Sequence, residues 1–153
     1  MGCEERLKEM GIALPEAPRP VAAYVPFVVV NDLVFTSGQL PVADGALRYT
    51  GRVGEELTLE AGQTAARLCA VNCLAVVRAA AGSLDKVLQV VKITGYVAGA
   101  PGFYGQPQVL NGASELLESV FGAAGRHARA AVGVSALPLG APVELEMVVR
   151  ISV

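Results

Sequence analysis

The chain has 153 residues, a formal net charge of −2 and a sequence pI of about 5.4. This length is sufficient for one domain, residues 1–153, with a sizeable hydrophobic core. The slightly acidic balance and the lack of any basic stretch argue against nucleic acid as a general partner.

The composition is apolar for a protein of this size. Hydrophobic residues make up 53% of the chain and charged residues only 17%, and the mean hydropathy is +0.49. No apolar run is expected to be long enough to cross a bilayer, so no membrane partner is predicted. We expect instead that part of the surface is buried in an oligomer, because obligate interfaces resemble a hydrophobic core.

Cysteine and histidine usage argues against a metal centre. The chain has three cysteines and one histidine, and Cys69 and Cys73 lie four residues apart in a helical pattern. No metal-ligand set of the usual spacing can be assembled from these residues. The cysteines are interpreted as free thiols in a reducing compartment, which predicts a cytoplasmic protein without a bound metal.

The first third of the chain predicts a short helix and two strands. Residues 4–10 favour a helix that Gly11 ends, and the proline-rich residues 14–20 cannot continue it. We expect this opening to lie extended on the body of the domain. Residues 24–30 and 33–37 are apolar strand-like runs that an Asn-Asp turn separates.

A short strand, a helix, a further strand and a second helix follow. Residues 46–50 predict a short strand, and Thr58 is a suitable N-cap for a helix that Gly82 ends. The C-terminal half of this helix is apolar nearly all round, which predicts that it is covered on most sides. Residues 87–97 alternate as a strand, and a second amphipathic helix starts near Pro107.

The last third predicts two strands, 126–135 and 143–153, joined by a turn that contains proline and glycine. On the second strand, the odd-numbered positions are apolar and most even-numbered positions are polar. On the first strand, Arg129 shares its face with Ala131 and other very small side chains. A long cation with room around it suggests a pocket for a small anion.

This order of elements predicts an α+β fold. Two amphipathic helices cannot cover both faces of one sheet well, so a single mixed β-sheet with both helices packed on one face is the economical arrangement. The other face would still be apolar, and it is the expected oligomer surface.

Six blocks of sequence resemble one known family. They occur in the family's order and cover the chain from about residue 24 onward. The family is the Rid superfamily of reactive intermediate deaminases, also called YjgF or endoribonuclease L-PSP proteins. The blocks are Tyr24, FTSGQLP at 35–41, VVKIT at 90–94, ARAAV at 128–132, ALP at 136–138 and VELE at 143–146.

The resemblance implies a chorismate-mutase-like fold and a homotrimer with ligand clefts between its subunits. It implies hydrolysis of reactive enamines or imines, such as 2-aminoacrylate, to a 2-keto acid and ammonia, with no cofactor. The short enzymes of the family have no counterpart of residues 1–23, which we therefore treat as an N-terminal extension.

The resemblance also implies roles for individual residues. Arg129 matches the arginine that holds the substrate carboxylate, and Glu144 matches the glutamate that positions the attacking water. Ala131 stands where the family has a cysteine that acts through its backbone carbonyl. The chemistry is reasonable, because an arginine fork suits a carboxylate and a carboxylate base assists the attack of water. The positions that match other residues lining the cleft are Tyr24, Ser37, Gly38 and Asn111.

Other interpretations of these residues are retained. Arg129 is also consistent with a structural cation that pairs with Glu144 or Glu146, and Glu146 is the rival of Glu144 as the catalytic carboxylate. His127, the only histidine, has no triad partner near it in sequence and is placed at a strand start, at the rim of the cleft. The alternative functions are a non-catalytic trimer that binds or senses a small carboxylate and, less favoured, an endoribonuclease.

Overall fold

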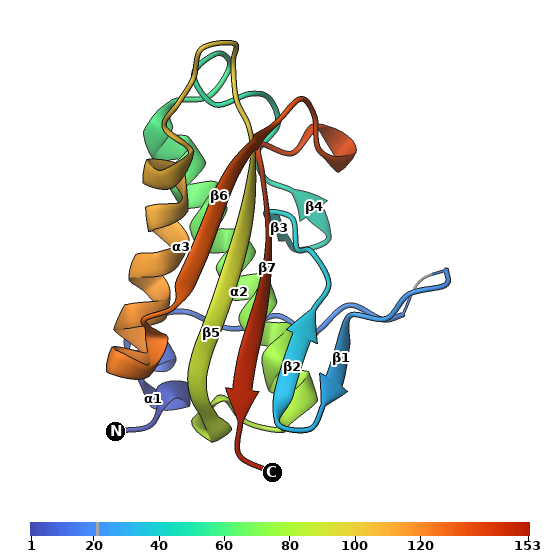
Figure 1. Cartoon of the computed structure of the whole chain (residues 1–153), viewed down its shortest axis with the longest axis vertical. Helices are drawn as coiled ribbons and strands as arrows, with labels where there is room; N and C mark the ends of the chain where they lie inside the picture. The colour runs from blue at the N-terminus through green and yellow to red at the C-terminus, as the bar shows by residue number, and fades with distance from the viewer. Residues whose placement is uncertain (21) are drawn as a thin grey trace.

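The structure is a computed structural model that describes residues 1–20 and 22–153. Its main feature is a five-stranded mixed sheet with the strand order β1-β2-β7-β5-β6 (Figure 1). β6 runs parallel to β5, and the other neighbouring strands are antiparallel. The strands are β1 (Phe27–Val30), β2 (Leu33–Thr36), β5 (Val87–Ala98), β6 (Ala128–Val134) and β7 (Val143–Ile151).

Two long helices cover one face of this sheet. α2 (Leu59–Ala81) and α3 (Gln106–Phe121) lie behind it in Figure 1, which confirms the prediction of a mixed sheet with its helices on one face. The helices approach closely because Gly112 lacks a side chain: a Cβ there would lie 2.0 Å from the carbonyl oxygen of Gln63. The hydrophobic core lies between the sheet and these helices.

The last two strands do not form a hairpin, so that interpretation of the sequence is wrong. β7 lies between β2 and β5, and β6 lies at the edge of the sheet beyond β5. The connection between β6 and β7 contains η3 (Pro138–Gly140) and passes across the end of β5 (Figure 1). Alternation of side chains defines which face each one takes, but it does not define which strand lies alongside.

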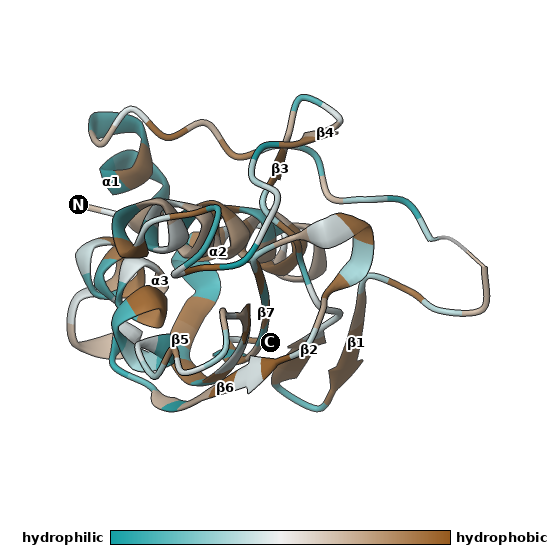
Figure 2. Ribbon diagram, turned by 90° about the horizontal axis from the view of Figure 1, so that it is seen from above, coloured by the Kyte–Doolittle hydropathy of each residue, from teal (hydrophilic) through white to brown (hydrophobic). Residues whose placement is uncertain are grey.

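The strand expected at residues 46–50 does not join the main sheet. β4 (Ala46–Leu47) pairs with β3 (Val42–Ala43) in a separate two-stranded hairpin. Figure 2 shows this hairpin on the same side of the sheet as the helices. The single sheet predicted from the sequence is therefore corrected to a five-stranded sheet and a small hairpin.

α2 lies in the middle of the fold. With 23 residues and few charges it is long and apolar enough, by length and composition alone, to cross a membrane, contrary to the expectation from the sequence. Its apolar side chains are used in the core, where Cys69 and Cys73 have no exposed surface. Thr58 caps the first turn, as predicted, by accepting a hydrogen bond from the Ala61 amide at 3.1 Å.

The N-terminal segment lies on the outer side of the helices. α1 (Cys3–Glu9), which confirms the predicted short helix, packs at one end of the helix layer. The chain that follows crosses α2 on the side that faces away from the sheet (Figure 2). Leu7 anchors α1, with only 2% of its surface exposed. This outer layer explains why the C-terminal half of α2 is covered nearly all round.

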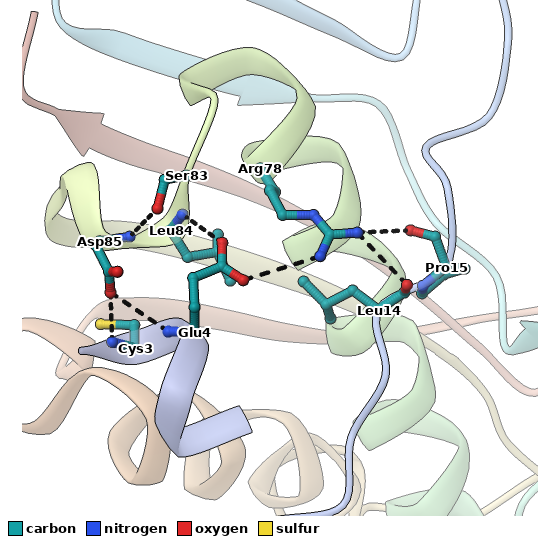
Figure 3. Close-up of polar contacts among 8 residues, drawn as sticks. All are labelled: Cys3, Glu4, Leu14, Pro15, Arg78, Ser83, Leu84 and Asp85. Carbon is teal, nitrogen blue, oxygen red and sulfur yellow. Dashed lines mark hydrogen bonds and ion pairs between the residues drawn. The ribbon is translucent and has the colours of Figure 1, made fainter. Parts of the chain in front are cut away.

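Polar contacts join α1 to the C-terminal end of α2 and to η1 (Leu84–Lys86), as Figure 3 shows. The Asp85 carboxylate accepts hydrogen bonds from the backbone amides of Cys3 and Glu4, at the start of α1. The Glu4 carboxylate accepts a hydrogen bond from the Leu84 amide at 3.0 Å and lies 3.9 Å from the Arg78 guanidinium. The N-terminal segment is therefore fixed to the body of the domain by side chains from α1 and by side chains from α2 and η1.

Within residues 1–20 and 22–153, no helix lies on the opposite face of the sheet (Figure 1). Val28, Phe35 and Val132 lie on this uncovered face and are 52%, 41% and 41% exposed. Glu144 and Glu146 lie there too, because the alternate residues of β7 are buried in the core. The partly apolar outer face expected from the sequence is present.

Candidate functional site

Arg129 lies on β6, and its side chain contacts α3. Nη1 donates hydrogen bonds to Asn111 Oδ1 at 2.9 Å and to Ser114 Oγ at 3.1 Å. In the part of the chain that the structure describes, Arg129 forms no ion pair with Glu144 or Glu146, so that structural role is not supported. Its residue surface is exposed. One nitrogen of the guanidinium fork is held by the helix, and the fork remains accessible to an anion.

A chain of hydrogen bonds continues from Arg129 to His127. Ser114 Oγ lies 2.9 Å from His127 Nε2, and His127 Nδ1 lies 2.6 Å from the carbonyl oxygen of Gly125. Because a carbonyl oxygen only accepts, the neutral ring carries its proton on Nδ1, and Nε2 accepts from the Ser114 hydroxyl. Sequence analysis missed Ser114. Its position three residues after Asn111, on the same helix surface, is the signal that could have found it.

These residues border a hollow of about 280 Å³ at the edge of the sheet. It is lined from α3, η2 (Gly122–Gly125) and β6, and Arg129 is one of the lining residues. Ala131 lies two positions further along β6, packs against the core and adds no bulk beside Arg129. The hollow therefore gives room on one side of this cation, although its lining includes Glu115 and Glu118 rather than the small residues of β6. We call Arg129, Asn111, Ser114 and Ala131 the arginine half-site.

Glu144 lies on β7, on the uncovered face of the sheet. It is in register with Tyr96 of β5, and Glu146 lies two positions further along on the same face. Burial and, secondly, the charge of Glu146 raise the pKa of the Glu144 carboxyl. Tyr96 Oη donates a hydrogen bond to Glu146 Oε1 at 2.6 Å, and this bond is the main reason that the pKa of Tyr96 is raised to about 12. A carboxyl group with a raised pKa is better matched to proton transfer near neutral pH.

Ser37 and Gly38 follow β2 and run beside β7. Ser37 Oγ donates a hydrogen bond to the carbonyl oxygen of Val25 at 2.6 Å, which holds this turn next to Tyr24. A Cβ on Gly38 would lie 2.8 Å from Glu144 Oε1, so the absence of a side chain leaves space for the carboxylate. Tyr24 is 62% exposed. We call Glu144, Tyr24, Ser37 and Gly38 the glutamate half-site.

One chain does not bring the two half-sites together. Arg129 is in register with the buried Ile93 and lies on the helix-covered side of the sheet, whereas Glu144 lies on the uncovered face. β5 separates β7, which carries Glu144, from β6, which carries Arg129, so these two strands lie about 10 Å apart, which is two strand spacings. The site residues predicted from the sequence therefore form two separate groups within the monomer.

The buried cysteines offer no reactive group to either half-site. The thiols of Cys69 and Cys73 lie 3.6 and 3.3 Å from the carbonyl oxygens of Val143 and Leu145. Burial raises the pKa of both thiols, that of Cys73 to about 12, so both are protonated and poor nucleophiles. Among residues 1–20 and 22–153, no three His, Cys, Asp or Glu side chains are grouped closely enough to hold a metal ion.

Comparison with known families identifies the fold. The family model described as "YjgF/chorismate mutase-like, putative endoribonuclease" matches residues 4–149. The chain belongs to this family. The match spans nearly the whole chain, and it confirms the resemblance to the Rid superfamily that the six sequence blocks indicated.

This YjgF-family chain has similar relatives among curated proteins and solved structures. It is 46% identical to protein TCP17 of Trypanosoma cruzi over 147 residues, which covers 95% of the chain and 92% of that protein. It is 34% identical to the RutC family protein y4sK of Sinorhizobium fredii over 141 residues, covering 92% and 97%. The structure of Atu1372 of Agrobacterium tumefaciens, described as a protein of unknown function, matches with a TM-score of 0.92 at 48% identity, covering 98% and 92%.

Proposed function

We propose that this YjgF-family protein hydrolyses reactive enamines or imines of the 2-aminoacrylate type to 2-keto acids and ammonia, in a cleft between two subunits. The observation that carries the proposal is the division of the site: a guanidinium held by α3 in one half and a partly buried carboxylate in the other. Imine hydrolysis requires one group to hold the substrate and one to activate water. Each half-site supplies one of them.

The arginine half-site holds the substrate carboxylate in this proposal. Asn111 and Ser114 fix Nη1 of Arg129, so less conformational entropy is lost when an anion binds the rest of the fork. A carboxylate accepts two parallel hydrogen bonds from such a fork, which orients the substrate as well as binding it.

The glutamate half-site activates water. An enamine first takes a proton on its terminal carbon and becomes the imine. Glu144 then accepts a proton from water while the water oxygen bonds to the imine carbon, and it passes this proton to the nitrogen, which gives a tetrahedral carbinolamine. The hydroxyl then loses its proton to the nitrogen through Glu144 as the carbon–nitrogen bond breaks. Ammonia leaves and the oxygen becomes the keto carbonyl, so that imine and water yield keto acid and ammonia. A positioned carboxylate base contributes typically about 100- to 10,000-fold to such a step.

A second copy of the chain brings the half-sites together in this proposal. A closed homotrimer repeats one head-to-tail contact three times, so that each cleft receives an arginine half-site from one subunit and a glutamate half-site from the next. The exposed apolar side chains of Val28, Phe35 and Val132 support the assembly, because obligate interfaces are rich in such groups.

The test is hydrolysis of 2-aminoacrylate, generated in situ by a serine dehydratase, with the wild type and two variants. The wild type is expected to accelerate keto-acid formation, and Arg129→Ala and Glu144→Gln are expected to abolish the acceleration. Arg126→Ala is the matched control, because Arg126 lines the same hollow but is paired with Glu118 at 2.9 Å. If the wild type and all variants form keto acid only at the uncatalysed rate, the proposed deaminase activity is refuted.

The same protein samples test the two alternative functions. A non-catalytic trimer would bind pyruvate in a way that depends on Arg129 but would not accelerate hydrolysis. An endoribonuclease, which the family description names, would cut single-stranded RNA. We expect no RNA cleavage that differs between the wild type and Glu144→Gln, since a contaminating nuclease would act equally in both samples.

A further inference from the structure

A groove of about 360 Å³ adjoins the glutamate half-site. Tyr24, Ser37 and Gly38 line one end of it, and it continues away from them between residues 15–20, the β3–β4 hairpin and α2. We call this the proline-walled groove. Three residues of the glutamate half-site, all but Glu144, therefore line the groove. The groove extends beyond them into space that the three-carbon 2-aminoacrylate does not need.

The outer wall of the groove is made by the N-terminal segment, which carries Pro15, Pro18 and Pro20 there. Proline fixes the backbone angle φ, so a segment with three prolines in six residues is stiff. Arg78 of α2 donates hydrogen bonds to the carbonyl oxygens of Leu14 and Pro15 at 3.5 and 3.4 Å, where this wall begins (Figure 3). The start of the wall is consequently anchored to α2.

The wall made by α2 and the start of the hairpin is largely apolar, although Glu16, Arg19 and Asp44 also line the groove. Leu40, Val42 and Ala75 contribute aliphatic surface. Asn72, the buried polar residue of this wall, uses its amide nitrogen to donate hydrogen bonds to the carbonyl oxygens of Leu40 and Val42, both at 2.9 Å. Within the described residues, no buried side-chain nitrogen or oxygen lacks a hydrogen-bond partner. Such a lining favours an apolar ligand group, because a polar one would lose its hydrogen bonds to water.

The groove has the size of a binding pocket rather than of a packing defect. Pockets for small organic ligands have volumes of about 300 to 1,000 Å³ and are lined mostly by apolar groups. A methyl or methylene group held at Ser37 and Gly38 would leave most of the groove filled with water. A branched aliphatic or aromatic side chain would displace that water.

We propose that the proline-walled groove is the side-chain pocket of the site, and that its substrates are 2-imino acids with branched aliphatic or aromatic side chains. This proposal rests on the proposed function, which places the imine between Arg129 of one subunit and Glu144 of the next. The N-terminal segment then has a specific role: it forms the outer wall of the pocket and sets the preference for large side chains.

The test compares ligands that differ only in the side chain. Binding of pyruvate and of 4-methyl-2-oxopentanoate to the full-length protein is measured by calorimetry, and kcat/KM is measured for the imines that an amino-acid oxidase makes from alanine and from leucine. The wild type is expected to prefer the leucine-derived compound at least tenfold in both experiments, since each buried methylene favours binding by about fourfold.

Two variants alter the groove without touching either half-site. Ala43→Phe fills the groove from the β3–β4 hairpin, and Arg78→Met removes the hydrogen bonds that anchor its outer wall. Both variants are expected to prefer the larger ligand less than threefold and still to hydrolyse the alanine-derived imine. Ala79→Phe, exposed on α2 and outside the groove, is the matched control and should keep the preference. Thermal unfolding verifies that each variant is folded.

The outcomes separate this proposal from the proposed function. Hydrolysis of both imines without a preference, or a preference that neither groove variant reduces, overturns the side-chain pocket and leaves the deaminase standing. A binding preference that Ala43→Phe removes, in a protein that hydrolyses neither imine, overturns the deaminase and supports the pocket. Failure to bind either keto acid overturns both.

Discussion

Arg129 and Glu144 lie on opposite faces of the same β-sheet. Arg129 contacts α3 from the edge strand β6, and Glu144 lies beside Tyr96 on the face that no helix covers. A guanidinium and a carboxylate in this arrangement cannot act on one small molecule within a single chain. Any chemistry that uses both requires two copies, and this requirement can be tested directly.

We expect two inactive variants to restore activity to each other. If Arg129→Ala and Glu144→Gln are unfolded together in equal amounts and reassembled, a site is intact only where an unaltered arginine half-site meets an unaltered glutamate half-site. For random assembly of a ring, that occurs in about a quarter of the clefts, so about a quarter of wild-type activity is expected. The rate of 2-aminoacrylate hydrolysis by the reassembled mixture measures this recovered activity.

The control for this mixing experiment is a pair of variants in one half-site. Arg129→Ala mixed with Asn111→Ala places an altered arginine half-site in every cleft, and no recovery beyond the activity of the separate variants is expected. Recovery in that mixture, or none in the first, would show that the clefts are not built from two chains as we propose.

The pH dependence of hydrolysis should report on Glu146. Glu144 acts as a base only when ionised, so kcat/KM falls as the pH is lowered through its pKa. The negative charge of Glu146 adds to the effect of burial in raising that pKa. Glu146→Gln removes the charge, lowers the pKa of Glu144 and is expected to move the acidic limb of the profile to lower pH. Glu118→Gln, an exposed carboxylate on α3, should leave the limb where it is, and a shift to higher pH in Glu146→Gln would contradict the assignment.

Ser114 should matter for carboxylate binding although it is not expected to touch the substrate. Its hydroxyl accepts from Arg129 and lies between that cation and His127. Ser114→Ala is expected to weaken pyruvate binding by about fivefold, the typical value of one hydrogen bond, as measured by calorimetry. Ser119→Ala removes an exposed hydroxyl of the same helix that donates a hydrogen bond to the Glu115 carbonyl oxygen, and this variant should bind pyruvate as the wild type does. Equal effects of the two substitutions would mean that the helix, rather than Arg129, is being disturbed.

Gly38→Ala should displace the Glu144 carboxylate. The added Cβ would lie 2.8 Å from Glu144 Oε1, and a flexible carboxylate can move away, so the fold should survive. A displacement of about 1 Å in a catalytic group typically lowers the rate about 100-fold, and kcat for 2-aminoacrylate should fall to a comparable extent. In the background of Glu144→Gln the same substitution should cost little further activity, because the two changes act through one group. Additive losses would show that Gly38 acts independently of Glu144.

The attachment of the N-terminal segment should contribute modestly to stability. Arg78→Met removes two long hydrogen bonds and a 3.9 Å ion pair with Glu4 while retaining much of the aliphatic packing. The free energy of unfolding is expected to fall by about 1 kcal/mol in urea denaturation. Arg48→Met, which breaks an exposed ion pair with Asp44 on the β3–β4 hairpin, should change it by less than about 0.5 kcal/mol. A loss in Arg78→Met no larger than in this control would show that the anchor is energetically unimportant.

Local sequence was a good guide to individual elements. Thr58 and Gly82 bracket α2 as predicted, because caps and left-handed glycines act within one turn of the helix end. The alternation along β7 assigned Leu145 to the core and Glu144 to the other face correctly. These features depend on backbone geometry and side-chain period, which neighbouring residues determine.

Partners distant in the sequence were harder to predict. Nothing close to Arg129 in sequence indicated that Ser114, 15 residues earlier on α3, would accept a hydrogen bond from it and link it to His127. The six-residue run with three prolines was expected to lie on the body, but its position as the wall of a groove beside Ser37 and Gly38 depends on α2 and on the hairpin. Burial and hydrogen bonding between distant segments have no local signature.

The sequence by itself determined the family, the α+β class and the faces of the strands, since period, caps and motif blocks are properties of contiguous residues. Only the tertiary structure decided that β6 pairs in parallel with β5 rather than with β7, and hence that Arg129 and Glu144 lie on opposite faces of the sheet. Strand order is set by which apolar faces pack against α2 and α3. That choice is made by the whole core and cannot be reached from any single stretch of the chain.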